Sequence, residues 1–335
     1  MNEWIIQDHG AEELSPLCDL RATFELRTGG LTTLERIARK MDCLPSGFTC
    51  DDADRAAMIT ERTGLAHKTD GEAADLDHPC IKTLWDILDN LPQLLERDLE
   101  EATELGSPNS GSVVGDRSVN VDPTVTIFPG VVFDATDGAI RVEEGATIRP
   151  NAVICGPCWI GKGTTIVDGA HIKSNTSIGP KCKIGGEVGG TIIQGNTNKS
   201  HSGHLGDSVI GEWVNFGAGT TNSNLLNTYS DVIITDLNGM HHRTNRQFVG
   251  CFVGDHVKFA IETRIMTGTI CGTGAMVAST GSPPAPTPRF AWHTDNGTKL
   301  FRIEKFLDTA RTVMARRGCK LESATEVMIR KLADR

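Results

Sequence analysis

The chain has 335 residues and a formal net charge of −10, from 33 lysines and arginines against 43 aspartates and glutamates. The length allows one large domain or two, and the acidic balance argues against nucleic acid or an anionic membrane as a partner, because both need a basic surface. The sequence shows neither a signal peptide nor a run of about 20 apolar residues. We therefore expect no membrane partner, and a cytoplasmic protein whose ten cysteines stay reduced.

The first part of the chain, residues 1–110, has helical periodicity and many charges over residues 31–42 and 82–104. Residues 106–116, GSPNSGSVVGD, are typical of a linker, because Gly, Ser, Asn and Pro favour turns. The pattern predicts a small, α-containing N-terminal region that is distinct from the rest of the chain.

The middle of the chain repeats with a period of six residues. Small residues follow most of the repeated aliphatic positions four places later. The aliphatic positions are Val142, Ile148, Ile154, Ile160, Ile166, Ile172, Ile178 and Ile184. Six residues fit neither a helical turn nor simple strand alternation, but they fit one short strand plus one turn. Three such units close a coil, and stacked coils bury a narrow core. The sequence therefore predicts a mainly β chain built on a left-handed parallel β-helix of hexapeptide repeats.

The same period extends to both sides of this run. It is found again at Val119, Val125, Val131, Ile210, Phe216, Val253, Phe259, Ile265, Cys271 and Val277. We expect the β-helix domain over residues 111–283, with loops at about 186–208 and 222–252. Binding and catalytic residues are often found on loops that a rigid scaffold holds. Residues 284–335 follow a Pro-rich exit, and their amphipathic pattern predicts a C-terminal helical tail packed on the rod or on a neighbouring subunit.

The most distinctive motif lies in residues 186–224. It contains Lys199-Ser200-His201, Leu205-Gly206-Asp207, Val214-Asn215 and Gly217-Ala218-Gly219-Thr220. With these residues at this spacing, the segment resembles the acetyltransferase domain of the bifunctional N-acetylglucosamine-1-phosphate uridylyltransferase/glucosamine-1-phosphate acetyltransferases. It is also similar to the sugar nucleotidyltransferase relatives of that hexapeptide-repeat family. The resemblance covers about residues 165–280.

This resemblance implies an acyl-CoA-dependent acyltransferase that works as a homotrimer, with acetyl-CoA as donor and an amino sugar phosphate or nucleotide sugar as acceptor. His201 matches the general base, a role that suits imidazole because an amine must lose a proton in order to attack. The positions that match substrate-binding residues are Lys173, Glu187, Lys199, His204, Asn215 and Asn224. Ala218 and Ser279 match the acyl-CoA contacts.

Two positions depart from the family pattern. Gly189 stands where the family has a second phosphate-binding lysine, and His204 stands where it has a tyrosine. The loss of one cation makes a different amino or hydroxy sugar plausible as the acceptor.

Residues 14–37 resemble the start of the nucleotidyltransferase-like region of the same relatives. However, the Gly-rich, Arg-closed loop that holds nucleotide phosphates in those enzymes is missing from this sequence. We interpret the region as a reduced remnant in which Arg21 and Arg27 are candidate anion ligands. Two alternatives stay open: a sugar-1-phosphate nucleotidyltransferase of the UDP- or dTDP-sugar pyrophosphorylase type, and a non-catalytic trimeric sugar-binding scaffold.

Two short motifs point to other chemistry when taken alone. Cys155-Gly156-Pro157-Cys158 matches the thioredoxin-type redox motif, but it lies inside the six-residue period, where Cys158 takes a small inward position. This context favours a core thiol. His201 and His204 have the spacing of metal ligands, but no acidic or cysteine partner lies at ligand spacing nearby, so we expect no metal.

Overall fold

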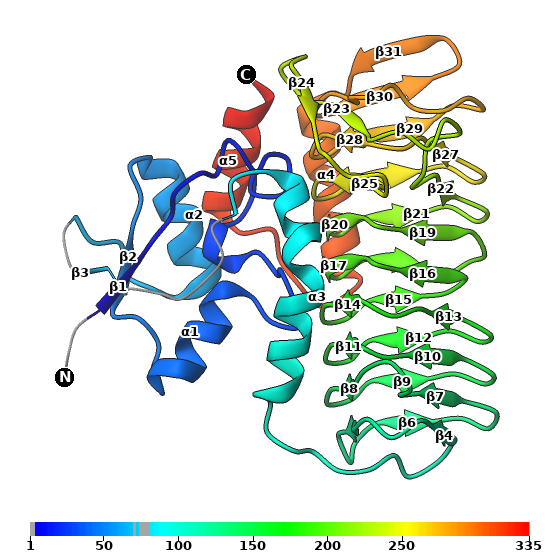
Figure 1. Cartoon of the computed structure of the whole chain (residues 1–335). Coiled ribbons are helices and arrows are strands. Elements are labelled where there is room, and N and C mark those ends of the chain that lie inside the picture. Colours follow the sequence, from blue (N-terminus) through cyan, green and yellow to red (C-terminus); the bar gives the residue numbers. More distant parts are fainter. Residues whose placement is uncertain (1–3, 70–71, 74–80, 335) are drawn as a thin grey trace.

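The computed structural model of the chain describes residues 4–69, 72–73 and 81–334 (Figure 1). Most of the molecule is a rod of stacked three-strand coils whose strands pair in parallel, which confirms the predicted β-helix. A small α/β unit and the C-terminal helices lie along one side of this rod. No helix within the described ranges has both the length and the apolar character needed to cross a membrane.

The rod has three faces, and each face is built mainly from one sheet. The first face contains β4 (Ser112–Val114), β7 (Val132–Asp134), β10 (Val153–Cys155), β13 (His171–Ile172), β16 (Glu187–Gly189) and β19 (His204–Gly206). The second contains β5 (Val119–Val121), β8 (Ile140–Val142), β11 (Cys158–Ile160), β14 (Thr176–Ile178), β17 (Ile192–Gly195), β20 (Val209–Glu212), β25 (Cys251–Val253) and β28 (Thr269–Cys271). The third contains β6 (Thr126–Ile127), β9 (Thr147–Ile148), β12 (Thr165–Ile166), β15 (Lys183–Ile184), β18 (Asn198–Lys199), β21 (Asn215–Phe216), β26 (Lys258–Phe259), β29 (Met276–Ala278), β30 (Ala291–Thr294) and β31 (Gly297–Leu300).

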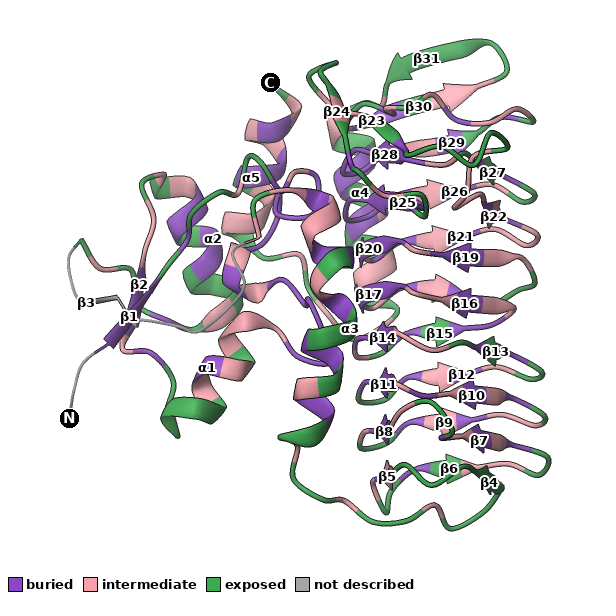
Figure 2. Ribbon diagram, in the orientation of Figure 1, coloured by how far each residue is buried: buried purple, intermediate pink, exposed green. Residues whose placement is uncertain are grey.

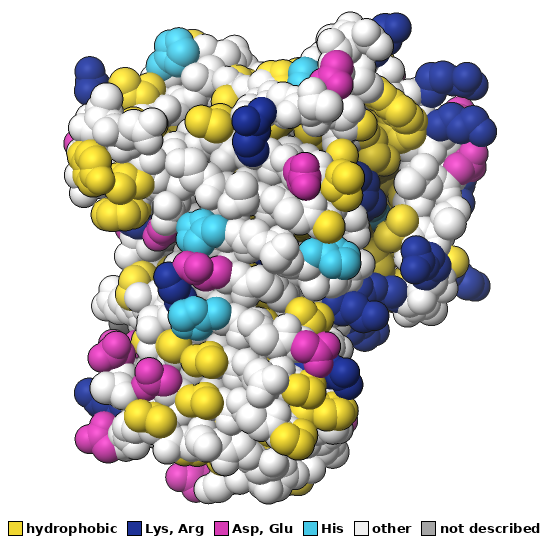
Figure 3. Space-filling view, turned by 90° about the vertical axis from the view of Figure 1, so that its right-hand side faces the viewer, with side chains coloured by type: hydrophobic (Ala, Val, Ile, Leu, Met, Phe, Trp, Pro, Cys, Tyr) yellow, Lys and Arg dark blue, Asp and Glu magenta, His cyan; other side chains and the backbone are white. Residues whose placement is uncertain are grey.

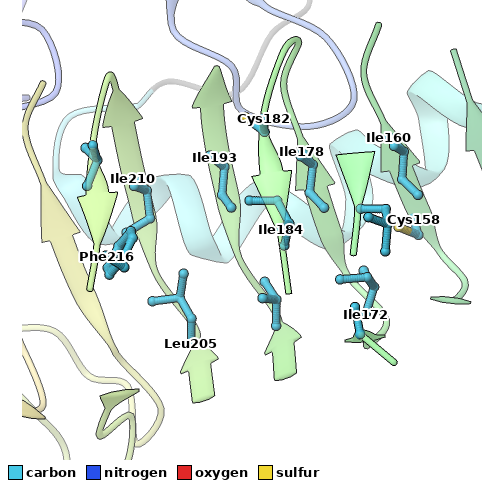
Figure 4. Packing of buried hydrophobic residues seen from close by; sticks show 14 of the residues in the cluster. Cys158, Ile160, Ile172, Ile178, Cys182, Ile184, Ile193, Leu205, Ile210 and Phe216 are labelled. Atoms are coloured by element: carbon cyan, nitrogen blue, oxygen red, sulfur yellow. The ribbon is translucent and has the colours of Figure 1, made fainter. Parts of the chain in front are cut away.

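The core of the rod is formed by large side chains that point inward in continuous columns, one column for each face. On the third face, Ile148, Ile166 and Ile184 stack in register. Figure 4 shows the same packing for the columns that contain Ile160, Ile172 and Ile178. Burying one such side chain stabilises the fold by roughly 1.5–3 kcal/mol. The predicted small positions, such as Cys158 and Cys182, are also buried in this core.

The phase of the first coil differs from the prediction. Val121, Ile127 and Phe133 stack below Val142, Ile148 and Ile154, and they are the large inward residues of this coil. The predicted Val119, Val125 and Val131 instead fill the small positions of the same core. The extra residues between β7 and β8 lengthen one corner, so the six-residue count does not run through it.

The first predicted loop is wrong, because residues 186–208 form a complete coil with strands β16, β17, β18 and β19. Val188 and Leu205 stay in register with Ile172 on the first face. This coil is shorter than three six-residue units, so that Ile184 stacks on Lys199. A polar residue at an inward position and a shortened coil break the six-residue pattern of the sequence, although the rod itself is continuous here.

The second predicted loop is confirmed as an insertion. After β22 (Thr221–Asn222), which pairs with β27 (Arg264–Ile265), the chain leaves the rod. It forms an antiparallel hairpin of β23 (Ile233–Thr235) and β24 (His241–Arg243) before it returns at β25.

The N-terminal unit contains a parallel sheet in the order β2-β1-β3, with β1 (Trp4–Gln7), β2 (Gly47–Thr49) and β3 (Glu72–Ala73). Its helices are α1 (Thr33–Met41) and α2 (Ala53–Thr63), and a short 3₁₀ turn covers Thr23–Glu25. Helix α3 (Leu84–Glu100) starts at a capping box in which Thr83 and Asp86 bond each other's backbone. Its leucines pack on outward apolar residues of the second face, including Trp159 and Phe252, so this face is covered.

The tail forms α4 (Ile303–Ala315) and α5 (Ser323–Ala333). The tail packs on the rod, as predicted, since Phe306 contacts the rings of Phe290 and His256 edge-on. It also shares a core with the N-terminal unit, in which Leu307 and Ile329 join Phe48. The first face and the edge between the first and third faces stay open, on the side away from the N-terminal unit (Figure 2).

Candidate functional site

The predicted base and acyl-CoA residues lie along one edge of the rod. The turns that lead from the third face to the first face stack at this edge, and they carry His201, Ala218 and Ser279. His201 is exposed, and no described side chain or backbone group hydrogen bonds its ring. Ala218 is half-buried and its carbonyl accepts a hydrogen bond from the Glu262 N–H at 2.7 Å. Ser279 is buried and its Oγ donates to the Gly281 carbonyl at 3.2 Å.

Lys199 holds the turn that carries His201. Its side chain replaces an isoleucine in the inward column, and its Nζ donates to the carbonyls of Gly185 at 3.0 Å, His201 at 3.2 Å and Gly203 at 2.6 Å. The three donors of the ammonium group are thereby satisfied by three acceptors. Burial lowers the pKa of Lys199 to about 8. The structure therefore places this residue, predicted to bind substrate, beneath the His201 turn.

The low pKa of Lys199 predicts a pH effect on stability. Above pH 8 the folded chain has lost this proton, whereas the unfolded chain keeps it up to about pH 10.4. The unfolded state then binds more protons, so the free energy of unfolding rises with pH in this window. A Lys199→Met variant cannot titrate here. Urea denaturation between about pH 7.5 and about pH 9.5 is expected to show wild type gaining stability relative to this variant, and a constant difference would contradict the assignment.

A second inward polar residue shapes the coil that follows His201. Asn222 occupies the column position between Leu205 and Ile265, and it accepts from the Gly206 N–H at 2.8 Å and donates to the Gly206 carbonyl at 2.9 Å. The side-chain amide of Asn222 thus makes the hydrogen bonds to the backbone of β19 that a neighbouring strand would otherwise make. Sequence reasoning missed Asn222, although its spacing of six from Phe216 marked it as an inward position.

A groove of about 540 Å³ runs along the first face, where it is lined mainly by the ends of the strands and by the turns that lead on to the second face. Gly189 and Gly206 form part of its floor. A Cβ atom on Gly206 would lie 2.5 Å from Cε1 of His204, and one on Gly189 would lie 2.9 Å from Cβ of Lys173. The groove is lined by Asp134, Asp137, Cys155, Gly156, His171, Lys173, Ser174, Asn175, Gly189, Gly190, His204, Gly206, Asp207 and Asn224. Figure 3 shows histidine, acidic and basic side chains gathered on the side of the rod turned away from the N-terminal unit.

Three predicted substrate residues, Lys173, Glu187 and His204, lie close together on the first face. Glu187 on β16 lies between His171 on β13 and His204 on β19 as their cross-strand neighbour. Lys173 Nζ lies 2.5 Å from Glu187 Oε1, and this hydrogen bond lowers the pKa of Glu187. His204 Nε2 lies 3.9 Å from the same carboxylate oxygen, while its Nδ1 lies 3.3 Å from the Asn222 carbonyl. A carbonyl can only accept, so this contact favours the proton on Nδ1 and leaves Nε2 free to accept one.

The two predicted asparagines occupy different faces. Asn224 lines the groove, where its Nδ2 donates to Asp207 Oδ2 at 2.6 Å, and burial raises the pKa of Asp207. Asn215 instead begins β21 on the third face, in register with Asn198 and Lys258. The edge that carries His201 separates Asn215 from the groove within one chain.

The two arginines predicted to bind an anion are buried, so that prediction is wrong. Arg21 is 1% exposed, and its guanidinium pairs with Asp255 and lies 3.6 Å from Glu212. Arg27 pairs with Glu35 at 3.5 Å and donates to a backbone carbonyl. Acceptor groups of the protein itself, from the rod for Arg21 and from the N-terminal unit for Arg27, thus take the place of a ligand.

The prediction of a core thiol at Cys158 is confirmed, since it is fully buried and burial raises its pKa. Cys155 is half-buried at the groove, with its Sγ 3.9 Å from Nε2 of His171. Across the parts of the chain that the structure describes, no three His, Cys, Asp or Glu side chains gather as a metal site.

The chain is similar to known proteins over part of its length. It is 33% identical over 165 residues to the bifunctional protein GlmU of Methanococcus aeolicus, a match that covers 49% of this chain and 39% of that protein. It is 29% identical over 207 residues to the GlmU of Methanococcus maripaludis, covering 61% and 43%. A bifunctional sugar-1-phosphate nucleotidylyltransferase/acetyltransferase of Sulfurisphaera tokodaii is 35% identical over 142 residues, covering 42% and 35%. The predicted resemblance is therefore confirmed, and the chain spans less than half the length of these relatives.

No family model matches the chain. Among solved structures, the acetyltransferase domain of PglB from Neisseria gonorrhoeae in complex with acetyl coenzyme A is 12% identical, with 90% of this chain and 100% of that chain covered and a TM-score of 0.22. The polySia specific acetyltransferase NeuO is 13% identical, with 58% and 87% covered and a TM-score of 0.22. These scores are too low for either structure to bear on function.

Proposed function

We propose that this chain is an acyl-CoA-dependent acyltransferase that transfers an acetyl group to the amine of a sugar, with His201 as the general base. The observation that carries the proposal is the exposed His201 ring, held on the open rod edge by the buried Lys199 ammonium. A polar groove lies on the adjoining face. The similarity to bifunctional nucleotidylyltransferase/acetyltransferases supports the same reaction class.

The chemistry needs few protein groups. The sugar amine attacks the thioester carbonyl, so that a C–N bond forms and the C–S bond breaks after a tetrahedral intermediate. His201 accepts the amine proton, and the CoA thiolate leaves and takes up a proton. The turns at Ala218 and Ser279 offer an edge along which acyl-CoA lies, and backbone N–H groups of this edge are candidates to stabilise the oxyanion.

We propose that the active form is a homotrimer. Ile261, with 69% of its surface exposed, lies on the same edge as His201 and Ala218. An exposed apolar residue beside a candidate base favours burial against another surface. A neighbouring rod packed at this edge brings Asn215 of one chain and the groove of another to one site, which a single convex edge cannot do.

A coupled assay tests this function. Purified protein with acetyl-CoA is expected to release free CoA thiol when amino sugars are supplied, and the same preparation is expected to have three times the chain mass of 36.1 kDa in solution. Absence of thiol release over a panel of amino sugars, phosphorylated and unphosphorylated, would contradict the proposal. Release of pyrophosphate from a nucleoside triphosphate and a sugar 1-phosphate would instead support a nucleotidyltransferase.

A further inference from the structure

The groove on the first face has an unusual charge for a site that resembles sugar-phosphate enzymes. Its lining contains three carboxyl groups, on Asp134, Asp137 and Asp207, and one lysine, Lys173. Hydrogen bonds from Thr136 lower the pKa of Asp134, so that it is ionised at neutral pH. A phosphate dianion that enters this groove meets like charges, which cost free energy.

The one lysine in the groove lining is already paired with a fourth carboxyl group. Lys173 Nζ lies 2.5 Å from Glu187 Oε1, and Glu187 is held next to it by the pairing of β13 with β16. The residue in register with Lys173 on the adjacent strand is Gly189, which has no side chain to contribute. A phosphate at Lys173 therefore shares the ammonium group with Glu187 and meets the repulsion of that carboxylate.

The groove is also long. Its lining residues come from five neighbouring strands of the first face and the turns beside them, β7, β10, β13, β16 and β19. Strands in a sheet are about 4.8 Å apart, so the groove extends for about 19 Å along the rod. This length exceeds that of one sugar ring. The end away from His204 offers Asp134, Asp137 and the Cys155–His171 pair, none of which a single ring at His204 reaches.

We propose that the acceptor is an unphosphorylated amino-oligosaccharide, whose reacting ring lies at His204 and Asn224 and whose next ring lies over Cys155, Asp134 and Asp137. This inference rests on the proposed acyltransferase function and names the substrate class for that site. Carboxylates accept hydrogen bonds from sugar hydroxyl and ammonium groups, and an acidic groove attracts an amine in its protonated form.

Calorimetric titration of the full chain with three acceptors tests the inference. The probes are the β-1,4-linked disaccharide of glucosamine, glucosamine, and glucosamine 1-phosphate. We expect the disaccharide to bind at least about tenfold tighter than glucosamine 1-phosphate, a difference of about 1.4 kcal/mol, and its affinity to fall with added salt. Equal affinities, or tighter binding of the phosphorylated sugar, overturn the inference.

Two substitutions sharpen the test. Glu187→Gln releases Lys173, and it is expected to tighten glucosamine 1-phosphate binding about tenfold, because the freed ammonium can pair with phosphate. Asp137→Asn is expected to weaken the disaccharide about threefold to tenfold and to leave glucosamine unchanged, because only the second ring reaches Asp137. The matched control is Glu144→Gln, which breaks an exposed lysine pair, with Lys162, outside the groove. If Glu187→Gln changes the affinity for glucosamine 1-phosphate no more than this control does, Glu187 does not keep Lys173 from binding phosphate, and the inference fails.

Thiol release with the same acceptors separates this inference from the proposed function. Thiol release with glucosamine 1-phosphate alone keeps the acyltransferase and overturns the acceptor class. The absence of thiol release from all three, despite tight disaccharide binding, overturns the acyltransferase and leaves the acceptor class as a binding preference of the groove.

Discussion

Replacement of His201 by alanine is expected to lower kcat for CoA-thiol release by about 10²–10⁴-fold, the usual contribution of a general base. The imidazole is exposed on the rod edge and, among the described residues, makes no hydrogen bond that the fold needs. The free energy of unfolding is therefore expected to change by less than about 0.5 kcal/mol. Steady-state kinetics and urea denaturation of one preparation measure both quantities.

Two histidine variants serve as comparisons for this result. His241→Ala removes an exposed histidine of the inserted hairpin, whose Nδ1 bonds the Thr235 hydroxyl, and it is expected to keep wild-type activity. His204→Ala removes a ring whose Nε2 is free to accept a proton in the groove. If His204→Ala abolishes turnover while His201→Ala retains it, the base is His204 and our assignment is wrong.

Replacement of Arg21 by alanine is expected to destabilise the chain by about 3–5 kcal/mol, the usual cost of removing one partner of a buried ion pair. Arg21 comes from the N-terminal unit and pairs with Asp255 of the rod, and both side chains are almost completely buried. Glu212 lies 3.6 Å from the same guanidinium and also pairs with Arg62 at 3.4 Å. Without Arg21, the buried carboxyl group of Asp255 loses its counter-charge at the junction of the unit and the rod, while Glu212 keeps Arg62.

A double-mutant cycle tests whether this cost comes from the unpaired charge. Adding Asp255→Asn to the Arg21→Ala background is expected to recover part of the lost stability, because the amide carries no charge and can still accept from the Glu212 N–H, which now bonds Asp255 Oδ1 at 2.6 Å. Arg311→Ala, which breaks an exposed pair with Glu326, is expected to cost less than about 1 kcal/mol. An equal loss of stability for Arg21→Ala and Arg311→Ala would show that the buried cluster has no special role.

The sequence predicts the rod well where each coil has three full units. Parallel stacking places residue types of one kind above each other, so Ile148, Ile166 and Ile184 repeat visibly. The prediction failed at residues 186–208, where the coil is shorter and Lys199 takes an inward position. A lysine is normally a sign of exposed chain. Only the three carbonyls that its ammonium group binds explain why it is tolerated there.

The candidate site was predictable only in part. The motif around His201 points to an exposed edge of the rod, where the role of this residue stays a prediction. Lys173, Glu187, His204 and Asn224 lie close together on the first face. The far end of the groove was missed because outward side chains do not contribute to the core pattern. Which of them become neighbours depends on the register between coils, and the shortened coil changes that register.

The core shared by the first and last parts of the chain has a consequence for the order of synthesis. Phe48 and Ile59 leave the ribosome early, whereas Leu307 and Ile329, against which they pack, are made after the whole rod. Domains usually fold as they emerge, from the N-terminus onward. Here the apolar side of the N-terminal unit that the tail covers stays exposed until the tail residues have been made.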